Sequence, residues 1–387
     1  MVRVRELGLE SWFQRWWRLS PGPRNAITDV IGVRVGHFTL IQGEGPLRRG
    51  QGPFRTGVTV IVPHGGDLYR EKVPAAVHVI NGFGKSVGLE QIRELGVLET
   101  PIALTSTLNV PRVADALITL ALEEHPHIGV GDDARGRPGY ATVNPVVGET
   151  NDGYLNDVHG RPIGLEHVRQ ALYQATGDEV EEGSVGAGTG TSCYGWKGGI
   201  GTASRVLPEQ VGGGTVGVLV QTNFGRPEEL VFLGVPVGAF LRPPNVTSEI
   251  GAGSLGGSVM VIIATDLPLT PRQLARLARR AAFGLARTGS VCHADSGDFV
   301  IAFSTAYTIP ERPAEPVGTY PVVVKEARVL NAAFLAVVEA VEEAVLNSLT
   351  TATTVVGRDG HVRYALPVEE VVELIQHYSE RCRENHG

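Results

Sequence analysis

The chain has 387 residues, 42% of them hydrophobic, and a formal net charge of −7 at pH 7. This composition is globular and the length allows a substantial core, while the mildly acidic balance gives no sign of nucleic-acid binding. Glycine is unusually frequent, with 50 residues, and because the Gly-X-Y period of collagen is missing, the glycines indicate many tight backbone approaches.

The first 24 residues form an N-terminal extension that is rich in aromatic side chains. Trp12, Phe13, Trp16 and Trp17 cluster there. They predict a short helix that packs on the core or on a partner subunit, because interfaces favour tryptophan. Binding to the surface of a bilayer is the alternative.

Beyond this extension, the hydrophobic period alternates between the two residues of a strand and the 3.6 residues of a helix. Thr270 followed by Pro271 is typical of a helix N-terminus. No repeat and no linker divides the chain, so residues 1–387 are expected to form one layered α/β domain with helices outside the sheets. The predicted elements, in chain order, are strands 57–63 and 75–82, helix 88–98, strand 100–106, helices 110–125 and 164–175, strands 215–225, 229–238 and 258–266, helix 271–287, strand 297–307, and helices 326–349 and 367–383.

The cysteines give no sign of a disulfide framework. Cys193, Cys292 and Cys382 are widely spaced and odd in number, so a reducing cytoplasm is the expected compartment. The N-terminal segment lacks the continuous apolar stretch of a signal peptide. No run of about 18 apolar residues occurs either, so no membrane span is expected.

Several familiar sites are missing from the sequence. The glycine-rich segment 183–208 lacks the ending of a phosphate loop, and no His-Glu-X-X-His motif occurs. Cys292 and His293 are adjacent, so on a strand their side chains would point to opposite faces and a dyad is not expected. The sequence therefore predicts neither a metal nor an organic cofactor.

Two Gly-Ser bonds, Gly253-Ser254 and Gly257-Ser258, precede a strongly apolar predicted strand. Ser258 begins that strand, whereas Ser254 lies within the preceding loop. Cleavage before Ser258 would give it both a hydroxyl nucleophile and a free α-amine, whose pKa of roughly 7.7–8.0 suits a base near neutral pH. The glycine before it permits the bent backbone that attack by the hydroxyl requires.

Blocks of sequence in a fixed order carry a further signal. They run from NAITDVIGVRVGH (25–37) through VVGETNDGYLND, GTGTSCYGWKGGIGTASR, VGVLVQTNFG and GSVMVIIATDLPL to a segment ending at residue 367. In these blocks the sequence resembles the DmpA-like family of self-processing serine aminopeptidases, which includes the L-aminopeptidase/D-Ala-esterase-amidases and the β-peptidyl aminopeptidases.

The resemblance implies a four-layer αββα sandwich of the N-terminal-nucleophile type that cleaves itself once. The cut would fall between Gly257 and Ser258 and give an α chain of residues 1–257 and a β chain of residues 258–387. Ser258 would be the nucleophile of a hydrolase that releases N-terminal amino acids from small peptides, amides or esters through an acyl-enzyme.

The resemblance also implies the residues that assist the nucleophile. Ser296 and Asp298 would relay protons, and their spacing across one glycine puts both side chains on one face of an extended segment. Asn223 would stabilise the oxyanion. Glu149 would bind the substrate ammonium, and Tyr154 of the same loop would line the pocket and hydrogen-bond the reacting oxygen.

Two positions depart from the family pattern. Asp298 stands where some relatives carry a longer glutamate, which alters the reach toward the nucleophile. Ser106 stands where many relatives are expected to have asparagine, which would alter a pocket wall.

Two other functions remain open at this point. One is an acyltransferase of the ornithine-acetyltransferase type, although those proteins cut themselves before threonine. The other is a binding or assembly protein that does not process itself. The sequence does not choose among L-amino acids, D-Ala amides and β-peptides, and the resemblance implies tetramers of αβ units.

Overall fold

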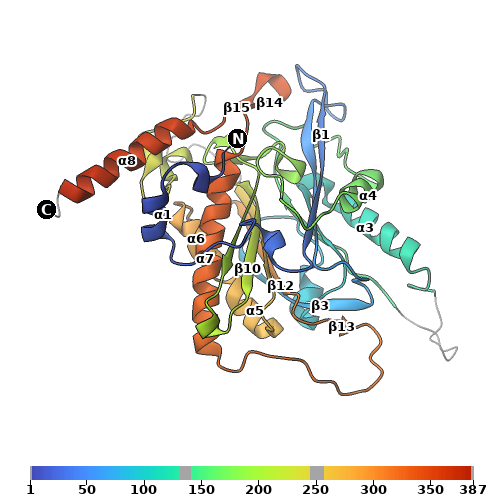
Figure 1. Ribbon diagram of the computed structural model, residues 1–387. Helices are drawn as coiled ribbons and strands as arrows, with labels where there is room; N and C mark the ends of the chain where they lie inside the picture. The colour runs from blue at the N-terminus through green and yellow to red at the C-terminus, as the bar shows by residue number, and fades with distance from the viewer. Residues whose placement is uncertain (1, 131–140, 245–256, 385–387) are drawn as a thin grey trace.

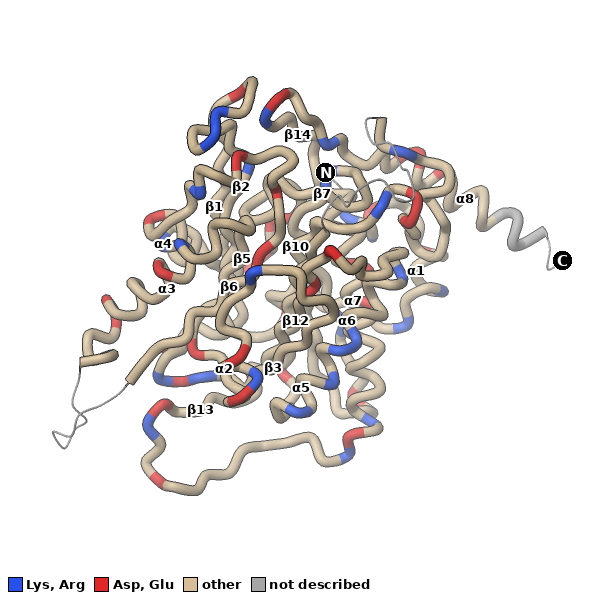
Figure 2. The backbone as a smooth tube through the Cα atoms, turned by 180° about the vertical axis from the view of Figure 1, so that it is seen from behind, with Lys and Arg blue, Asp and Glu red and all other residues tan. Residues whose placement is uncertain are grey.

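The computed structural model of the chain describes residues 2–130, 141–244 and 257–384. Two β-sheets lie face to face, and helices cover the outer face of each (Figure 1). Seen from behind, α3 and α4 lie on the opposite side of the sheets from α6 and α7 (Figure 2). The structure therefore has the αββα layering that the sequence predicts.

The smaller sheet has four strands in the order β1-β2-β5-β6. Its first three strands pair antiparallel, whereas β5 and β6 are parallel. As a result, β5 and β6 end at the same edge of the sheet. The strands are β1 (Arg34–Gln42), β2 (Phe54–Val62), β5 (Ile102–Ser106) and β6 (Val146–Thr150).

The larger sheet has seven strands, with the path β13-β3-β12-β11-β10-β9 and β4 paired with β3 off that path. Its central strands β11 and β12 are parallel, and β10 is antiparallel to β11. The strands are β3 (Glu71–Gly82), β4 (Val97–Leu98), β9 (Ile200–Val206), β10 (Thr215–Asn223), β11 (Gly257–Thr265), β12 (Ser296–Ser304) and β13 (Ile309–Pro310).

Three clusters of buried apolar side chains hold the layers together. One joins α3 and α4 to the smaller sheet, one fills the space between the sheets, and one joins the larger sheet to α5, α6 and α7. Another helix, α8, projects from the body (Figure 1). The helices are α1 (Glu10–Trp16), α2 (Leu89–Leu95), α3 (Val110–Glu124), α4 (Leu165–Tyr173), α5 (Pro271–Ala278), α6 (Ala281–Arg287), α7 (Glu326–Thr350) and α8 (Val368–Glu384).

Strand β11 alternates between the two faces of the larger sheet. Met260 and Ile262 belong to the cluster between the sheets, whereas Val259 and Val261 belong to the cluster under the helices. All four are at most 1% exposed. A strand buried on both faces in this way reads as a continuous apolar run, which is why its position was clear from the sequence.

Three of the predicted elements differ in the structure. The helix predicted over 88–98 ends at Leu95, and Val97–Leu98 form strand β4. The strand predicted over 229–238 is wrong, because the backbone turns at Leu233 and Gly234, whose φ angles are 50° and 81°. The helix predicted over 271–287 is divided into α5 and α6. The predicted cap is confirmed, since the Thr270 hydroxyl accepts a hydrogen bond from the backbone N–H of Gln273.

The aromatic N-terminal segment packs on the core of its own chain. The indole nitrogens of Trp16 and Trp17 donate hydrogen bonds of 2.7 and 2.9 Å to the two carboxylate oxygens of Glu342 in α7. Arg287 forms an ion pair with the same carboxylate at 3.0 Å. Phe13 stacks on Trp17, with ring centroids 5.5 Å apart. None of the described helices is both long enough and apolar enough to cross a bilayer.

We expect Trp17→Ala to lower the free energy of unfolding by about 3–5 kcal/mol, because a ring that is 4% exposed would leave a cavity. Urea denaturation measures the change. Tyr173→Ala is the matched control, since that ring is 91% exposed and its loss should change stability by less than about 0.5 kcal/mol. Equal effects of the two substitutions would contradict this role for the N-terminal segment.

Candidate active site

Three strand ends of the larger sheet meet at one edge, and the pairing of β11 with its neighbours fixes how they meet. Asn223, at the end of β10, is paired with Ser258. Gly257, at the start of β11, is paired with Ser296 at the start of β12. The edge therefore gathers most of the predicted catalytic residues although they come from separate parts of the chain.

The Ser258 hydroxyl points into the space between the two sheets. Ser258 shares a face of β11 with Met260, and its Oγ accepts a hydrogen bond of 3.2 Å from the backbone N–H of Asn151. Asn151 directly follows β6 of the smaller sheet. The side chain is 3% exposed, so the hydroxyl is held at the junction of both sheets.

Ser296 and Asp298 lie on the other face of the same sheet. Residues paired across two strands point the same way, so both side chains follow Gly257 and Val259 rather than Ser258. The Ser296 hydroxyl donates a hydrogen bond of 2.6 Å to Oδ1 of Asp298. The structure thus brings these two residues together beside the Gly257–Ser258 peptide bond.

The close approach of Ser296 explains why residue 257 is glycine. A Cβ atom built on Gly257 would lie 2.8 Å from Oγ of Ser296. Any larger residue would push this hydroxyl away. The Ser296 hydroxyl therefore lies close to Gly257, on the face of β11 opposite Oγ of Ser258.

Burial raises the pKa of Asp298, while hydrogen bonds from the Ser296 hydroxyl and the Cys292 thiol favour its ionised form. Burial also raises the pKa of Cys292, to about 11, so this thiol stays neutral. Cys292 has no dyad partner in the neighbouring histidine, because Nε2 of His293 lies 2.8 Å from Oε1 of Glu229.

Asn81 fixes the turn that leads into β12, and sequence reasoning missed it. Its side-chain amide donates hydrogen bonds to the backbone carbonyls of His293 and Ala294, at 3.1 and 3.0 Å, and to that of Ser296. Asn81 ends the neighbouring strand β3, and only the antiparallel pairing with β12 places it there. It positions Ser296 without lying next to it in the sequence.

The amide of Asn223 is oriented by two backbone groups. Its Oδ1 accepts a hydrogen bond of 3.0 Å from the N–H of Ser192, and its Nδ2 donates one of 2.8 Å to the carbonyl of Asn151. An amide nitrogen carries two hydrogens, so one donor remains available on the side of Ser258. The Asn223 amide and the N–H of Asn151, which donates to Oγ of Ser258, therefore lie together at this end of the sheet.

Glu149 lies on β6, two residues before Asn151. It is 3% exposed, and its Oε1 accepts a hydrogen bond of 3.0 Å from the backbone N–H of Lys85. Its Oε2 has no hydrogen-bond partner among the described residues. Burial raises the pKa of Glu149, whereas the backbone N–H and the charge of Lys85 lower it. Oε2 is left open to a further donor.

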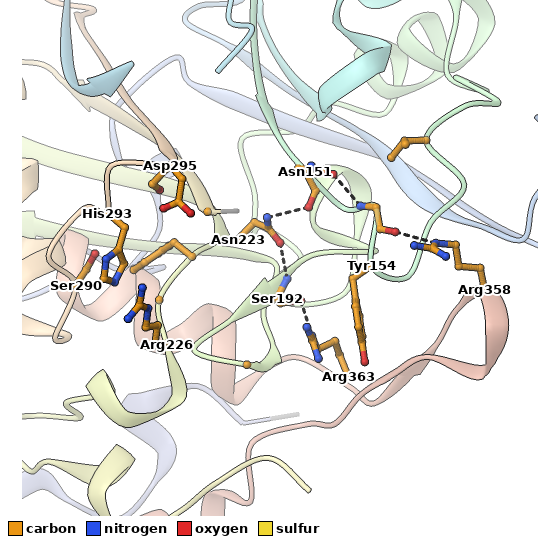
Figure 3. A pocket seen from close by; sticks show the side chains of 17 residues that line it. Asn151, Tyr154, Ser192, Asn223, Arg226, Ser290, His293, Asp295, Arg358 and Arg363 are labelled. Carbon is orange, nitrogen blue, oxygen red and sulfur yellow. Dashed lines mark hydrogen bonds between the residues drawn. The ribbon is translucent and has the colours of Figure 1, made fainter. Parts of the chain in front are cut away.

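A cavity of about 380 Å³ opens at this edge of the sheet (Figure 3). Its walls include Asn223, Gly257 and Ser296, together with Tyr154 and Arg363. Glu149 is not on these walls. No hydrogen bond within the described residues joins Tyr154 to Ser258; instead the ring stacks on His361, with centroids 4.5 Å apart.

Asp152 supports the loop that carries Asn151. It is 1% exposed and accepts hydrogen bonds from the Ser106 hydroxyl at 2.7 Å and the Asn156 amide at 2.9 Å. Burial raises its pKa to about 6. Ser106, where asparagine was expected, therefore holds this loop from beneath and is not part of the cavity wall.

A buried serine at the start of a strand, with a second serine bonded to a carboxyl group on the neighbouring strand, is the arrangement expected of a serine hydrolase of the N-terminal-nucleophile type. The family model of peptidase family S58 matches residues 25–363. The chain therefore belongs to peptidase family S58, and it is a serine aminopeptidase.

Relatives of known name and structure agree with this assignment. Beta-peptidyl aminopeptidase BapA from Sphingosinicella xenopeptidilytica is 40% identical over 384 residues, which cover 97% of this chain and 91% of that protein. The crystal structure of the PH0078 protein from Pyrococcus horikoshii OT3 matches with a TM-score of 0.87 and 48% identity, covering 98% and 99% of the two chains.

A third relative is a solved structure described as a variant of the Ntn hydrolase fold. The l-aminopeptidase d-ala-esterase/amidase from Ochrobactrum anthropi, described as a prototype of the serine aminopeptidases and a new variant among the Ntn hydrolase fold, matches with a TM-score of 0.84. The two chains are 36% identical, and the match covers 97% of this chain and 99% of that one. The predicted family and fold class are confirmed.

The pKa of Asp152 leads to a prediction about stability. Because burial raises this pKa from 3.8 to about 6, the folded chain keeps a proton that the unfolded chain releases between roughly pH 4 and pH 6. The contribution of Asp152 to stability is therefore full below pH 4 and is lost as the pH rises through 6.

We expect Asp152→Asn, which keeps Oδ1 as an acceptor, to remove about 2 kcal/mol of the stability difference between pH 4.5 and pH 7. Urea denaturation of both proteins at the two pH values measures it. Asp178→Asn is the control, because the Asp178 side chain is 81% exposed. An unchanged pH dependence in Asp152→Asn would show that this carboxyl group is ionised in the folded state throughout.

Proposed function

We propose that Ser258 is the nucleophile and that it becomes N-terminal when the chain cleaves its own Gly257–Ser258 bond. The observation that carries this proposal is the two-sided arrangement at that bond. The Ser258 hydroxyl lies on one face of β11, and the bonded pair Ser296 and Asp298 lies on the other, next to Gly257. The products would be an α chain of residues 1–257 and a β chain of residues 258–387.

Self-cleavage would proceed by transfer of an acyl group. The Ser258 hydroxyl attacks the carbonyl carbon of Gly257, the C–N bond breaks, and the nitrogen leaves as an α-amine after taking up a proton. Ser296, held by Asp298, is placed to deliver that proton. Water then hydrolyses the ester between Gly257 and Ser258 and frees both chain ends.

The same groups would then act on peptides. The α-amine of Ser258 has an ordinary pKa of roughly 7.7–8.0 and can accept the hydroxyl proton near neutral pH. Ser296 and Asp298 orient that amine from the opposite face. The Asn223 amide and the Asn151 N–H stabilise the oxyanion, and water finally hydrolyses the acyl-enzyme.

Glu149 would hold the substrate by its N-terminal ammonium group. An ammonium ion supplies the partner that Oε2 of Glu149 lacks, and a charge-assisted hydrogen bond between them is strong in a buried site. Glu149 and Asn151 leave the same end of β6, so the amino end of the substrate is directed along the smaller sheet. Tyr154 forms a wall of the cavity on the other side.

The substrates would be small peptides, amides or esters, and the activity requires no metal or organic cofactor. The acyltransferase and the non-processing binding protein gain no support from these observations. We further propose that αβ units assemble into a homo-oligomer, a tetramer by the family resemblance, in the cytoplasm. Exposed apolar side chains such as Ile31 and Phe283 suit such contacts.

We expect Ser258→Ala to abolish both self-cleavage and aminopeptidase activity, because the substitution removes the attacking oxygen. Denaturing mass spectrometry detects the two chains, and release of alanine from alanine p-nitroanilide measures activity. Ser254→Ala is the matched control at the other Gly-Ser bond, which lies outside the described residues, and it should still be cleaved before residue 258. Fragments from Ser258→Ala would identify another nucleophile.

Gly257→Ala is expected to slow self-cleavage by about tenfold, since its Cβ would collide with Oγ of Ser296 and overpacking of this kind costs roughly 1–3 kcal/mol. The fraction of cleaved chain is followed over time. Gly65→Ala is the control, because nothing lies within 4 Å of a Cβ at that position. Cleavage of Gly257→Ala at the normal rate would mean that Ser296 takes no part in maturation.

A further inference from the structure

One wall of the cavity carries a buried guanidinium group that no carboxylate neutralises. Arg363 is 5% exposed, and its Nε donates a hydrogen bond of 2.8 Å to Oγ of Ser192. The guanidinium lies over the ring of Tyr154, 3.5 Å from its centroid. No ion pair joins Arg363 to any carboxylate in the described parts of the chain.

A second guanidinium group faces the same cavity. The backbone N–H of Arg226 is bonded to Oε2 of Glu229, but its side chain forms no ion pair with any described residue. Glu229 is already engaged by His293 through its other oxygen. Figure 3 shows both guanidinium groups below Asn223, with Arg226 beside His293 and Arg363 beneath Ser192.

The remaining charges of the cavity do not balance these two groups. Arg358 also lines the cavity, but it is paired with Asp359 at 2.6 Å. Among the described lining residues, Asp295 is the one carboxylate, and it lies near His293, away from Arg363 (Figure 3). Two guanidinium groups without ion-pair partners among the described residues, Arg226 and Arg363, therefore face the cavity against one carboxylate.

A guanidinium removed from water is costly unless an anion and further hydrogen bonds compensate it. The planar fork of arginine matches the two oxygens of a carboxylate. An anion brought by the ligand would supply what the chain lacks here. The chemistry of this wall therefore points to a carboxylate as part of the substrate.

The wall lies within reach of a short peptide bound at Ser258. Asn223 is paired with Ser258, and its Oδ1 accepts a hydrogen bond from the N–H of Ser192. The Ser192 hydroxyl in turn accepts a hydrogen bond from Nε of Arg363. Each residue of an extended peptide spans roughly 3.3–3.6 Å. One or two residues beyond the scissile bond are thus enough to bring a C-terminal carboxylate to the guanidinium groups.

We propose that Arg363 and Arg226 bind the C-terminal carboxylate of the leaving group, so that the preferred substrates are dipeptides and tripeptides with a free C-terminus. The amino end of such a substrate lies along β6 toward Glu149, and the leaving amino acid extends into the cavity. This inference rests on the proposed role of Ser258 and its neighbours.

The test compares Ala-Ala and β-Ala-Ala as free acids with the same peptides as C-terminal amides. We expect kcat/KM of the matured wild-type enzyme to be about tenfold higher for the acids, as befits a hydrogen bond between two charged groups. Arg226→Gln should reduce this acid-to-amide ratio to near one, whereas Arg226→Lys should retain most of it. Arg363→Gln should also reduce the ratio, with a lower kcat for both substrates because Ser192 loses its support.

Arg93→Gln is the matched control, since it removes an exposed guanidinium from α2, outside the cavity walls. Its ratio should equal that of the wild type. An acid-to-amide ratio of kcat/KM near one in the wild type would overturn the carboxylate site. Arg363 would then be bound by water, or by the carboxylate that cleavage creates at Gly257. An enzyme that hydrolyses neither acid nor amide would instead contradict the proposed function itself.

Discussion

The site depends on the register of β11 between its two neighbours. This register pairs Asn223 with Ser258 and Gly257 with Ser296. Because side chains alternate along a strand, a slip by one residue would move the Ser258 hydroxyl to the helix side of the sheet. The hydroxyl would then lose Asn151, and Ser296 would no longer lie beside the bond to be cleaved.

Burial on both faces is what holds this register. The residues after Ser258 alternate between two separate apolar clusters, and a slip would exchange Val259 and Met260 between spaces of different shape. Met260 fills the place above Gly148, where an added Cβ would lie 2.4 Å from the methionine methyl carbon. The packing of a core strand therefore fixes the position of catalytic groups at its end, where the chain is otherwise polar.

The sequence was informative where the chemistry is local. Ser258 could be placed because a buried strand begins there, and the spacing of Ser296 and Asp298 predicts their common face. The helices and the strands β2, β3, β5, β10, β11 and β12 followed from periodicity, and the layers from the family resemblance. Strands β1, β6 and β9 were missed, so Glu149, expected in a loop, lies on a strand. Asn151 and Arg363 could not be found in this way, because their partners Ser258 and Ser192 are 107 and 171 residues distant along the chain.

The two faces of β11 carry different groups, Ser258 with its hydrogen-bond donors on one and Ser296 with Asp298 on the other. Peptidases usually place such groups on one side of the nucleophile. The Ser258 hydroxyl and the N–H of Asn151 lie between the sheets, whereas Ser296 and Asp298, the proposed relay to the α-amine, lie on the helix side. In the proposed cleavage the amine of Ser258 forms only when the bond breaks, so Ser296 and Asp298 could serve it only if they already lie beside the intact bond. Gly257 makes that possible, because only glycine leaves room for the Ser296 hydroxyl there. If the chain is cut before Ser258 as proposed, Gly257 leaves with the α chain, and the same side chains could first cut the chain and afterwards cut peptides.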